Sequence, residues 1–206
     1  TYIGIFDKYN WLTSHASKLT IPSQKQLDRD KAKARKILET LRSYDDENLS
    51  SIQRASKKIA IFDTENTLLR LETFPFHNYV LNQIGGAHID MVEFMTDTHP
   101  IRNLTEAEAY IDRVRLFEDV FEGHLYELNG QKAIDFYAPK FVYERVIAQL
   151  DEFLNFSFKE HPIYTEFDRK INDLNFSEEQ KMQLQENLKQ AIRQSIDCLL
   201  YTSDAA

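Results

Sequence analysis

Apolar side chains recur at every third or fourth position along most of this chain, which is the spacing of an amphipathic α-helix. The stretch from Ser23 to about Tyr44 is rich in residues that favour helices, and its apolar positions follow that spacing. A second helix is predicted from about Asn48 to Leu71. Its stripe consists of Ile52, Ile59, Phe62, Asn66 and Leu69, with Asn66 as the polar exception.

The middle of the chain contains a connection followed by two further predicted helices. The connection FPFHNYVLNQIGG ends at Gly85 and Gly86, and a short helix then ends before Pro100. The next helix is predicted to begin at Thr105, because Thr105 and Glu108 have the spacing of a capping box. We expect it to end near Asn129-Gly130. Its apolar stripe is Tyr110, Val114, Phe117, Phe121 and Leu125.

Three more helices are predicted towards the carboxyl end. They span about Pro139 to Leu154, Tyr164 to Leu174, and Ser177 to Ile196, the last opened by a capping box of Ser177 and Gln180. The fold class is therefore all-α, an irregular array of six to seven helices. The predicted organisation is an irregular segment 1–22, a helical region 23–196 and a tail 197–206.

The tail, with the sequence DCLLYTSDAA after Ile196, loses the helical stripe. It resembles translated adapter sequence that ends open reading frames assembled from environmental DNA, so we expect 197–206 to be non-native. The alternative is an ordinary frayed terminus. The chain also lacks an initiator Met, which suggests that the natural N-terminus is missing. The expectation is a truncated fragment.

Composition and charge narrow the class of partner. Hydrophobic residues make up 42% of the chain and charged residues 28%, which is typical of a globular protein rather than a disordered one. Glycine and proline number five each, which favours long helices over a β-sandwich. A net charge of -8 argues against nucleic acid as a partner. No apolar run reaches the length of a transmembrane segment, and Cys198 is the sole cysteine, so no internal disulfide is expected.

One stretch, KKIAIFDTENTLL, resembles the first motif of haloacid-dehalogenase phosphohydrolases. In that motif an apolar strand precedes Asp-x-Asp-x-Thr, and the first Asp is the nucleophile. Here Asp63 stands at the nucleophile position, but the general acid position holds Glu65, which is one methylene longer. The stretch also lies within a helical period. We therefore favour a helix with Asp63 and Glu65 facing water, and keep the phosphohydrolase as a third hypothesis.

The sequence offers no catalytic, cofactor-binding or metal-binding residue that we would assign. The six histidines are scattered, and no His-Glu-x-x-His or Glu-x-x-His pattern places metal ligands on one helical face. His99-Pro100 and His161-Pro162 are predicted to mark helix boundaries. The best candidates for lining a cleft are the side chains in the connection, namely Phe74, Phe76, His77 and Tyr79.

Four stretches resemble a known family. They are FPFHNYVLNQIGGAHIDMVEFMTDTHPI, AEAYIDRVRLFEDVFEGHLYEL with its Tyr-Ile-x-Arg group (Tyr110, Ile111, Arg113), APKFVYERVIAQLDEFL, and FDRKINDLNFSEEQKMQLQENLKQAI. In this order, from about Lys36 to Ile196, they are similar to the N-terminal part of the bacterial domain-of-unknown-function 885 family.

The resemblance implies part of a large helical-cleft protein that is similar to zinc metallopeptidases. Zinc and a general base would then belong to the C-terminal half, which would be this chain's missing partner, with a peptide as substrate. None of the catalytic residues match positions here. The resemblance also implies a parent exported to the cell envelope. The first hypothesis is a non-catalytic N-terminal wall of such a peptidase-like hydrolase. The alternative is a free-standing helical binding module, which would bury its apolar faces.

Overall fold

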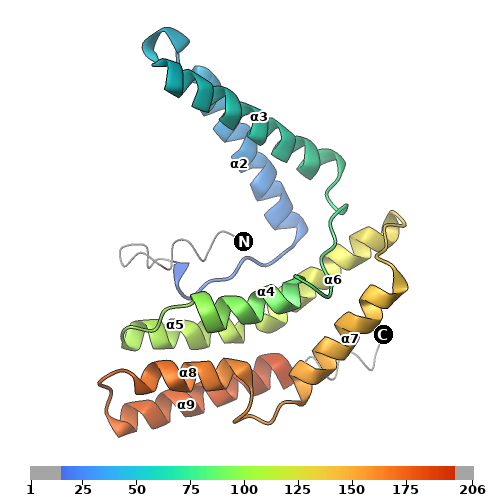
Figure 1. Ribbon diagram of the computed structural model, residues 1–206. Coiled ribbons are helices and arrows are strands. Elements are labelled where there is room, and N and C mark those ends of the chain that lie inside the picture. The colour runs from blue at the N-terminus through green and yellow to red at the C-terminus, as the bar shows by residue number, and fades with distance from the viewer. Residues whose placement is uncertain (1–14, 198–206) are drawn as a thin grey trace. The chain divides into compact units, whose positions relative to one another are not determined.

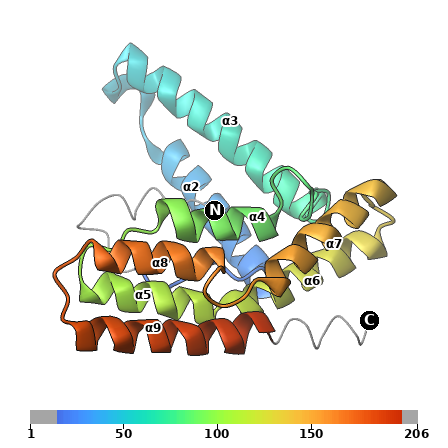
Figure 2. The ribbon, with the colours of Figure 1, turned by 60° about the horizontal axis from the view of Figure 1, so that its bottom comes forward.

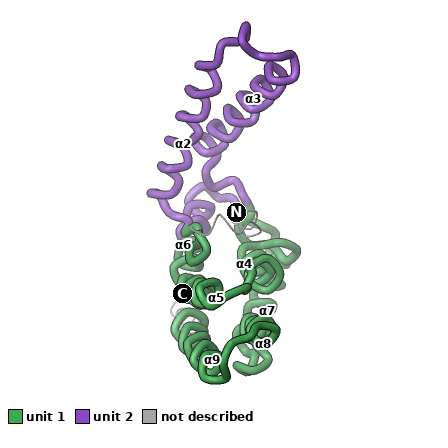
Figure 3. Tube along the Cα trace, turned by 90° about the vertical axis from the view of Figure 1, so that its left-hand side faces the viewer, with its two compact units in different colours: residues 1–21, 79–125, 137–206 green, residues 22–78, 126–136 purple. Residues whose placement is uncertain are grey.

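The computed structural model describes residues 15–197, and every regular element among them is a helix (Figure 1). The predicted all-α class is therefore confirmed. The predicted tail 197–206 with Cys198 lies outside the described residues apart from Asp197, as does most of the segment 1–22. The described part of the chain divides into two compact units, which Figure 3 colours separately. Unit 1 comprises residues 1–21, 79–125 and 137–206, and unit 2 comprises 22–78 and 126–136.

Unit 2 is built on a hairpin of two long helices, α2 (Gln24–Ser43) and α3 (Ser51–Thr73), joined through a single turn, η2 (Asp46–Asn48). Each long helix begins at a serine cap: the hydroxyl of Ser23 accepts from the amide of Gln26, and Ser50 forms a capping box with Gln53. Ala34 and Leu38 of α2 are buried in the hairpin. Ion pairs between α2 and α3, Arg42 with Glu65 at 2.6 Å and Arg35 with Glu72, flank the contact.

Unit 1 holds the main hydrophobic core. Its helices are α4 (Ala87–Glu93), the π-helical turn η3 (Phe94–Thr98), α5 (Leu104–Arg115), the first part of α6 (Phe117–Ala133), α7 (Lys140–Asn155), α8 (Pro162–Asn172), α9 (Glu178–Ile192) and the π-helical turn η4 (Arg193–Asp197). Helices α5 and α8 both pack against α9 (Figure 2). The buried side chains they contribute come at helical spacing, and include Tyr110, Val114, Ile163, Phe167, Ile171, Leu184 and Leu188.

The predicted helix from Thr105 to Gly130 is wrong in three respects. It begins earlier, because Asn103 rather than Thr105 is the cap and accepts from the amide of Glu106. It is interrupted at Leu116, where the amide bonds back to the carbonyl of Arg113, three residues earlier. Its second half, α6, also runs through Gly130 to Ala133. Among residues 15–197 there are thus eight α-helices, close to the six to seven predicted.

Gly130 has a packing role rather than a terminating one. A Cβ at this position would lie 2.4 Å from the ring of Phe76, so the ring packs directly on the helix backbone. The helix ends instead at Ala133, and Asp135, just beyond it, has a left-handed φ of 54°. The amide of Phe136 then bonds to the carbonyl of Gln131 at 3.0 Å, as in a Schellman motif.

The remaining boundaries agree with the sequence. Pro139 is the N-cap of α7. As the His-Pro pairs predict, His99 follows the end of η3, and His161 is the N-cap of α8 with Pro162 as its first residue. The capping box of Ser177 and Gln180 opens α9. Asp63 and Glu65 lie within α3 and are exposed, so the strand that the phosphohydrolase motif requires is absent from this stretch. No helix among the described residues has both the length and the apolarity to cross a membrane.

Candidate functional site

A pocket of about 230 Å³ lies within unit 1, between α4 and α7. Most of its lining is apolar and comes from Met91, Val92, Phe121, Leu150, Phe153 and Phe156. Polar groups are placed at its edge: His88 and Gln149, together with the exposed carboxylates of Glu93 and Glu152. The lining contains no hydroxyl or thiol that could act as a nucleophile. The arrangement suits an apolar group of modest size better than a reaction.

Hydrogen bonds fix the orientation of His88 at this pocket. The amide nitrogen of Gln149 donates to the carbonyl of Gln83 at 3.1 Å, which leaves its oxygen to face the His88 Nε2 at 3.0 Å. An amide oxygen can only accept, so Nε2 carries the proton and Nδ1 of a neutral ring is an acceptor. Nδ1 is buried and has no hydrogen-bond partner among the described residues. This pair could not be predicted from the sequence, because His88 and Gln149 are 61 residues apart.

The turn before α4 sets the position of His88. The side chain of Asn82 accepts from the amides of Ile84 and Gly85, at 3.0 and 2.8 Å. A Cβ at Gly86 would lie 2.7 Å from the backbone nitrogen of Asn82, so only glycine allows this tight return. The pair Gly85-Gly86, predicted to be a turn, is therefore the feature that presents His88.

The residues predicted to line a cleft are found in an aromatic cluster. In unit 2, the ring of His77 lies 5.2 Å from Phe74 and 5.2 Å from Phe136, while Phe76 meets Tyr126 at 5.7 Å. Phe74 and His77 remain exposed to solvent. Tyr79, also exposed, belongs to unit 1. The structure thus brings Phe74 and His77 together and places Phe76 against Tyr126 in the same unit. The role of these residues in a cleft stays a prediction.

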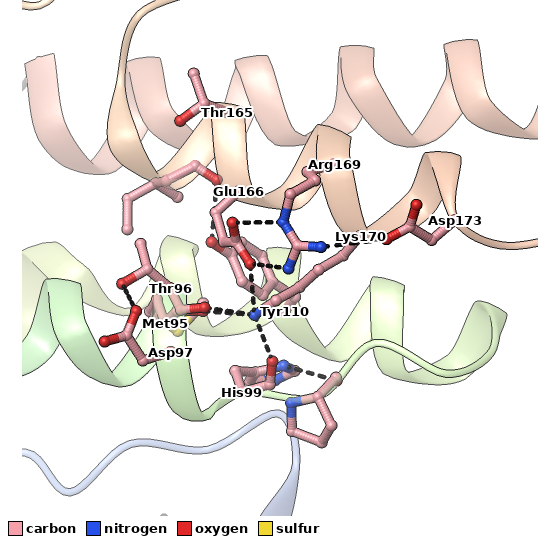
Figure 4. A network of polar contacts seen from close by, with 12 residues as sticks. Met95, Thr96, Asp97, His99, Tyr110, Thr165, Glu166, Arg169, Lys170 and Asp173 are labelled. Carbon is pink, nitrogen blue, oxygen red and sulfur yellow. Dashed lines mark hydrogen bonds and ion pairs between the residues drawn. The ribbon is translucent and has the colours of Figure 1, made fainter.

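A network of polar contacts beneath α8 holds the end of η3 (Figure 4). The ammonium group of Lys170 donates to the carbonyls of Thr96 and His99 at 2.6 and 2.9 Å, which satisfies backbone groups that the end of the helix leaves open. Burial lowers the pKa of Lys170, and Glu166 beside it acts in the opposite direction. Burial, with Arg113 nearby, lowers the pKa of His99 to about 3, so this ring is neutral. The network is structural, since each charged group is used in a protein contact.

The Tyr-Ile-x-Arg group is also structural. Tyr110, Ile111 and Arg113 are all buried, and the hydroxyl of Tyr110 donates to the carbonyl of Ile163 at 3.0 Å. Arg113 is fully buried. Its guanidinium donates to the carbonyls of Lys18 and His15, at 3.1 and 2.8 Å, and lies 4.8 Å from the centre of the Phe94 ring. This motif therefore fastens the segment before α2 to the core of unit 1.

No group of three or more His, Cys, Asp or Glu side chains within residues 15–197 is arranged to hold a metal ion.

Two of the comparisons with known proteins, by family and by fold, find similarity to this chain. The family model described as "Bacterial protein of unknown function (DUF885)" matches residues 1–200. The fold is similar to the crystal structure of the "putative lipoprotein" from Colwellia psychrerythraea, with a TM-score of 0.78 and 20% sequence identity over 88% of this chain. The chain spans 32% of that protein, about a third of its length. No curated protein matches the sequence.

Proposed function

Because the chain belongs to the DUF885 family of bacterial proteins, we propose that it forms the N-terminal helical part of a larger hydrolase resembling zinc-dependent peptidases. The observation that carries this proposal is the unequal coverage: 88% of this chain matches 32% of the Colwellia lipoprotein-like structure. A segment of a larger helical protein would give that result. Zinc and the general base would belong to the other part, because the residues described here do not fit a metal site.

In this proposal the aromatic cluster of unit 2 contributes to one wall of a substrate cleft. Phe74 and His77 keep exposed faces, and the ring of His77 packs against both Phe74 and Phe136. Rigid aromatic surfaces of this kind bind apolar side chains of a peptide without much loss of conformational freedom. The exposed ring of Tyr79 is a further candidate. These residues would bind substrate and take no part in bond cleavage.

Exposed apolar side chains support this proposal over a free-standing module. On α7, Ile147 is 57% exposed and Phe141 is 53% exposed, on a helix whose opposite face is buried through Val142 and Val146. A complete module would be expected to cover such side chains. In the larger protein, the remainder would pack on this face of α7. The neighbour's description as a "putative lipoprotein" supports a place in the cell envelope.

The test is to read the natural frame beyond codon 196 and to express all of it. We expect the frame to continue and to encode a His-Glu helix, and we expect the product to bind zinc and to hydrolyse peptides until a chelator is added. Within that enzyme, Phe74→Ala should raise KM and leave kcat unchanged. Tyr44→Ala, which removes another exposed aromatic ring, is the matched control. A natural stop at codon 196, or a full-length product without zinc, would refute the proposal.

A further inference from the structure

The outer face of α3 carries a long apolar stripe that no described residue covers. Ile52 is 77% exposed, Phe62 is 65%, Ile59 is 62% and Leu69 is 55%, and no residue of this helix is buried. The partly buried positions, which include Ala60, Ile61, Thr64 and Leu68, lie on another side of the helix. Helix α3 packs in the hairpin with α2 (Figure 1), and the partly buried positions lie on that side. The stripe is therefore a second, separate face.

The stripe has the spacing of a coiled coil. Counting from Ile52, its positions alternate in steps of three and four, which is a heptad repeat with three a and three d positions. The a positions are Ile52, Ile59 and Asn66, and the d positions are Ala55, Phe62 and Leu69. A single asparagine at an a position is the feature that specifies two parallel strands in register, because the two amides can hydrogen-bond to each other.

We propose that α3 pairs in parallel with α3 of a second copy of this chain. The charges beside the stripe fit this arrangement. In a parallel pair each g position faces the e position five residues further along the partner. Lys58 then faces Asp63 of the partner subunit, and Glu65 faces Arg70 of the partner subunit, so all four pairs generated by the two-fold axis are attractive.

The groups needed for these contacts are available. Lys58, Asp63 and Arg70 are exposed, and none of them forms an ion pair among the described residues. Glu65 binds Arg42 through one carboxylate oxygen, Oε1, and retains a second. The side-chain nitrogen of Asn66 donates to the carbonyl of Phe62 at 2.9 Å, which leaves its second N–H as a donor and its oxygen as an acceptor for the amide of the partner's Asn66.

An antiparallel pair is less favourable by the same reasoning. With the stripes overlapping fully, Lys58 would face Glu65 of the partner subunit, but Asp63 would face the uncharged Ser56 of the partner subunit. Asn66 would lie opposite Ala55, which offers no hydrogen bond from its side chain. The parallel arrangement therefore satisfies more of the polar groups that border the stripe.

The experiment measures the mass of this chain in solution by sedimentation over a concentration series. A dimer is expected, and Ile59→Glu should abolish it. Ile147→Glu on α7 is the matched control, because that isoleucine is similarly exposed but lies outside the stripe. Circular dichroism of each variant checks that the helices are retained. A monomer at every concentration would overturn the proposal.

Charge exchange tests the direction of pairing. Lys58→Glu should weaken the dimer about tenfold, since two attractive pairs become repulsive. Adding Asp63→Lys to Lys58→Glu should restore the dimer if the helices pair in parallel, because positions 58 and 63 then face each other with opposite charges again. It should not restore the dimer if they pair antiparallel. In a Cys198→Ser background, Ile52→Cys should form an intermolecular disulfide, whereas the exposed Thr67→Cys, off the stripe, should not. Failure of the double variant to recover, or equal cross-linking at both positions, would overturn the parallel pair. Neither result bears on the peptidase proposal, because that proposal is tested on the product of the complete reading frame.

Discussion

The ring of His161 is the most direct point at which pH should act on this fold. It caps α8 and lies between two aromatic rings, with centroids 4.7 Å from Phe153 and 6.2 Å from Phe156. Neither ring nitrogen has a hydrogen-bond partner among the described residues. Burial therefore lowers the pKa of His161 to about 4. The perturbation we choose is His161→Phe, which keeps an aromatic ring in this place and removes the proton-binding site.

The sign and size follow from linkage. A histidine in the unfolded chain has a pKa near 6.5, so between about pH 6.5 and 4 the unfolded state binds the extra proton and the folded state does not. Stability is therefore lost as pH falls through that window and levels off below it. For this one ring the loss is about 2 kcal/mol at about pH 5 and about 3 kcal/mol at about pH 4.

The assay is urea unfolding of the wild-type chain and of His161→Phe, each at a series of pH values from about 7.5 to 4.5. The quantity that matters is the difference between their free energies of unfolding, because carboxylates and His99 titrate in both proteins and cancel. That difference should shift by about 2 kcal/mol in favour of the variant between about pH 7.5 and 5. Phe167→Leu, a buried change on the same helix that keeps the imidazole, should stay parallel to wild type. Parallel curves for His161→Phe would refute the reasoning.

Three further changes test the packing described above, each by urea unfolding. Gly130→Ala should cost about 1–3 kcal/mol, because its Cβ would lie 2.4 Å from the ring of Phe76. Gly85→Ala would place its Cβ 4.0 Å from the carboxylate of Asp90, an ordinary van der Waals contact, and should be nearly neutral. Arg113→Met should cost about 1–3 kcal/mol by leaving the carbonyls of His15 and Lys18 without their donor, and should also expose residues 15–18 to protease; unchanged cleavage would count against the anchoring role. Ser177→Ala should cost about 1 kcal/mol, and Ser177→Asp should recover most of it if the cap is the cause.

The helices were predictable because their signals are local. Ser23 and the Ser177–Gln180 pair, the prolines that open α7 and α8, and the glycines before α4 each act within a few residues of their own position. Apolar spacing then identifies the helix between two such signals. The division at Leu116 has no such mark in the sequence, since an amide changes its acceptor there without glycine or proline.

Two sequence signals led to wrong predictions, because the same residue types occur in more than one structural role. Thr105 and Glu108 have the spacing of a capping box, but Asn103 caps the helix instead. Glu106 also stabilises the first turn of this helix: its carboxylate accepts from the amide of Arg102 at 2.7 Å and forms an ion pair with the Arg102 guanidinium. Asn129-Gly130 is a sequence typical of a helix end. Here, however, glycine is needed because the ring of Phe76, 54 positions away, packs directly on the helix backbone. Contacts between distant segments decide such cases, and a single sequence does not contain them.

The same distinction explains why the site was harder to predict than the fold. Helical spacing identified α3, but it did not show that the apolar stripe and the face against α2 are different faces. Nor did it show that Arg113 is fully buried and hydrogen-bonded to backbone carbonyls, although arginine side chains are usually exposed. A periodic pattern gives the angle between apolar positions around a helix. Which partner covers each face depends on segments elsewhere in the chain or on another molecule. For α3, the charges at Lys58, Asp63, Glu65 and Arg70 supply the missing information, because they are complementary to their own copy.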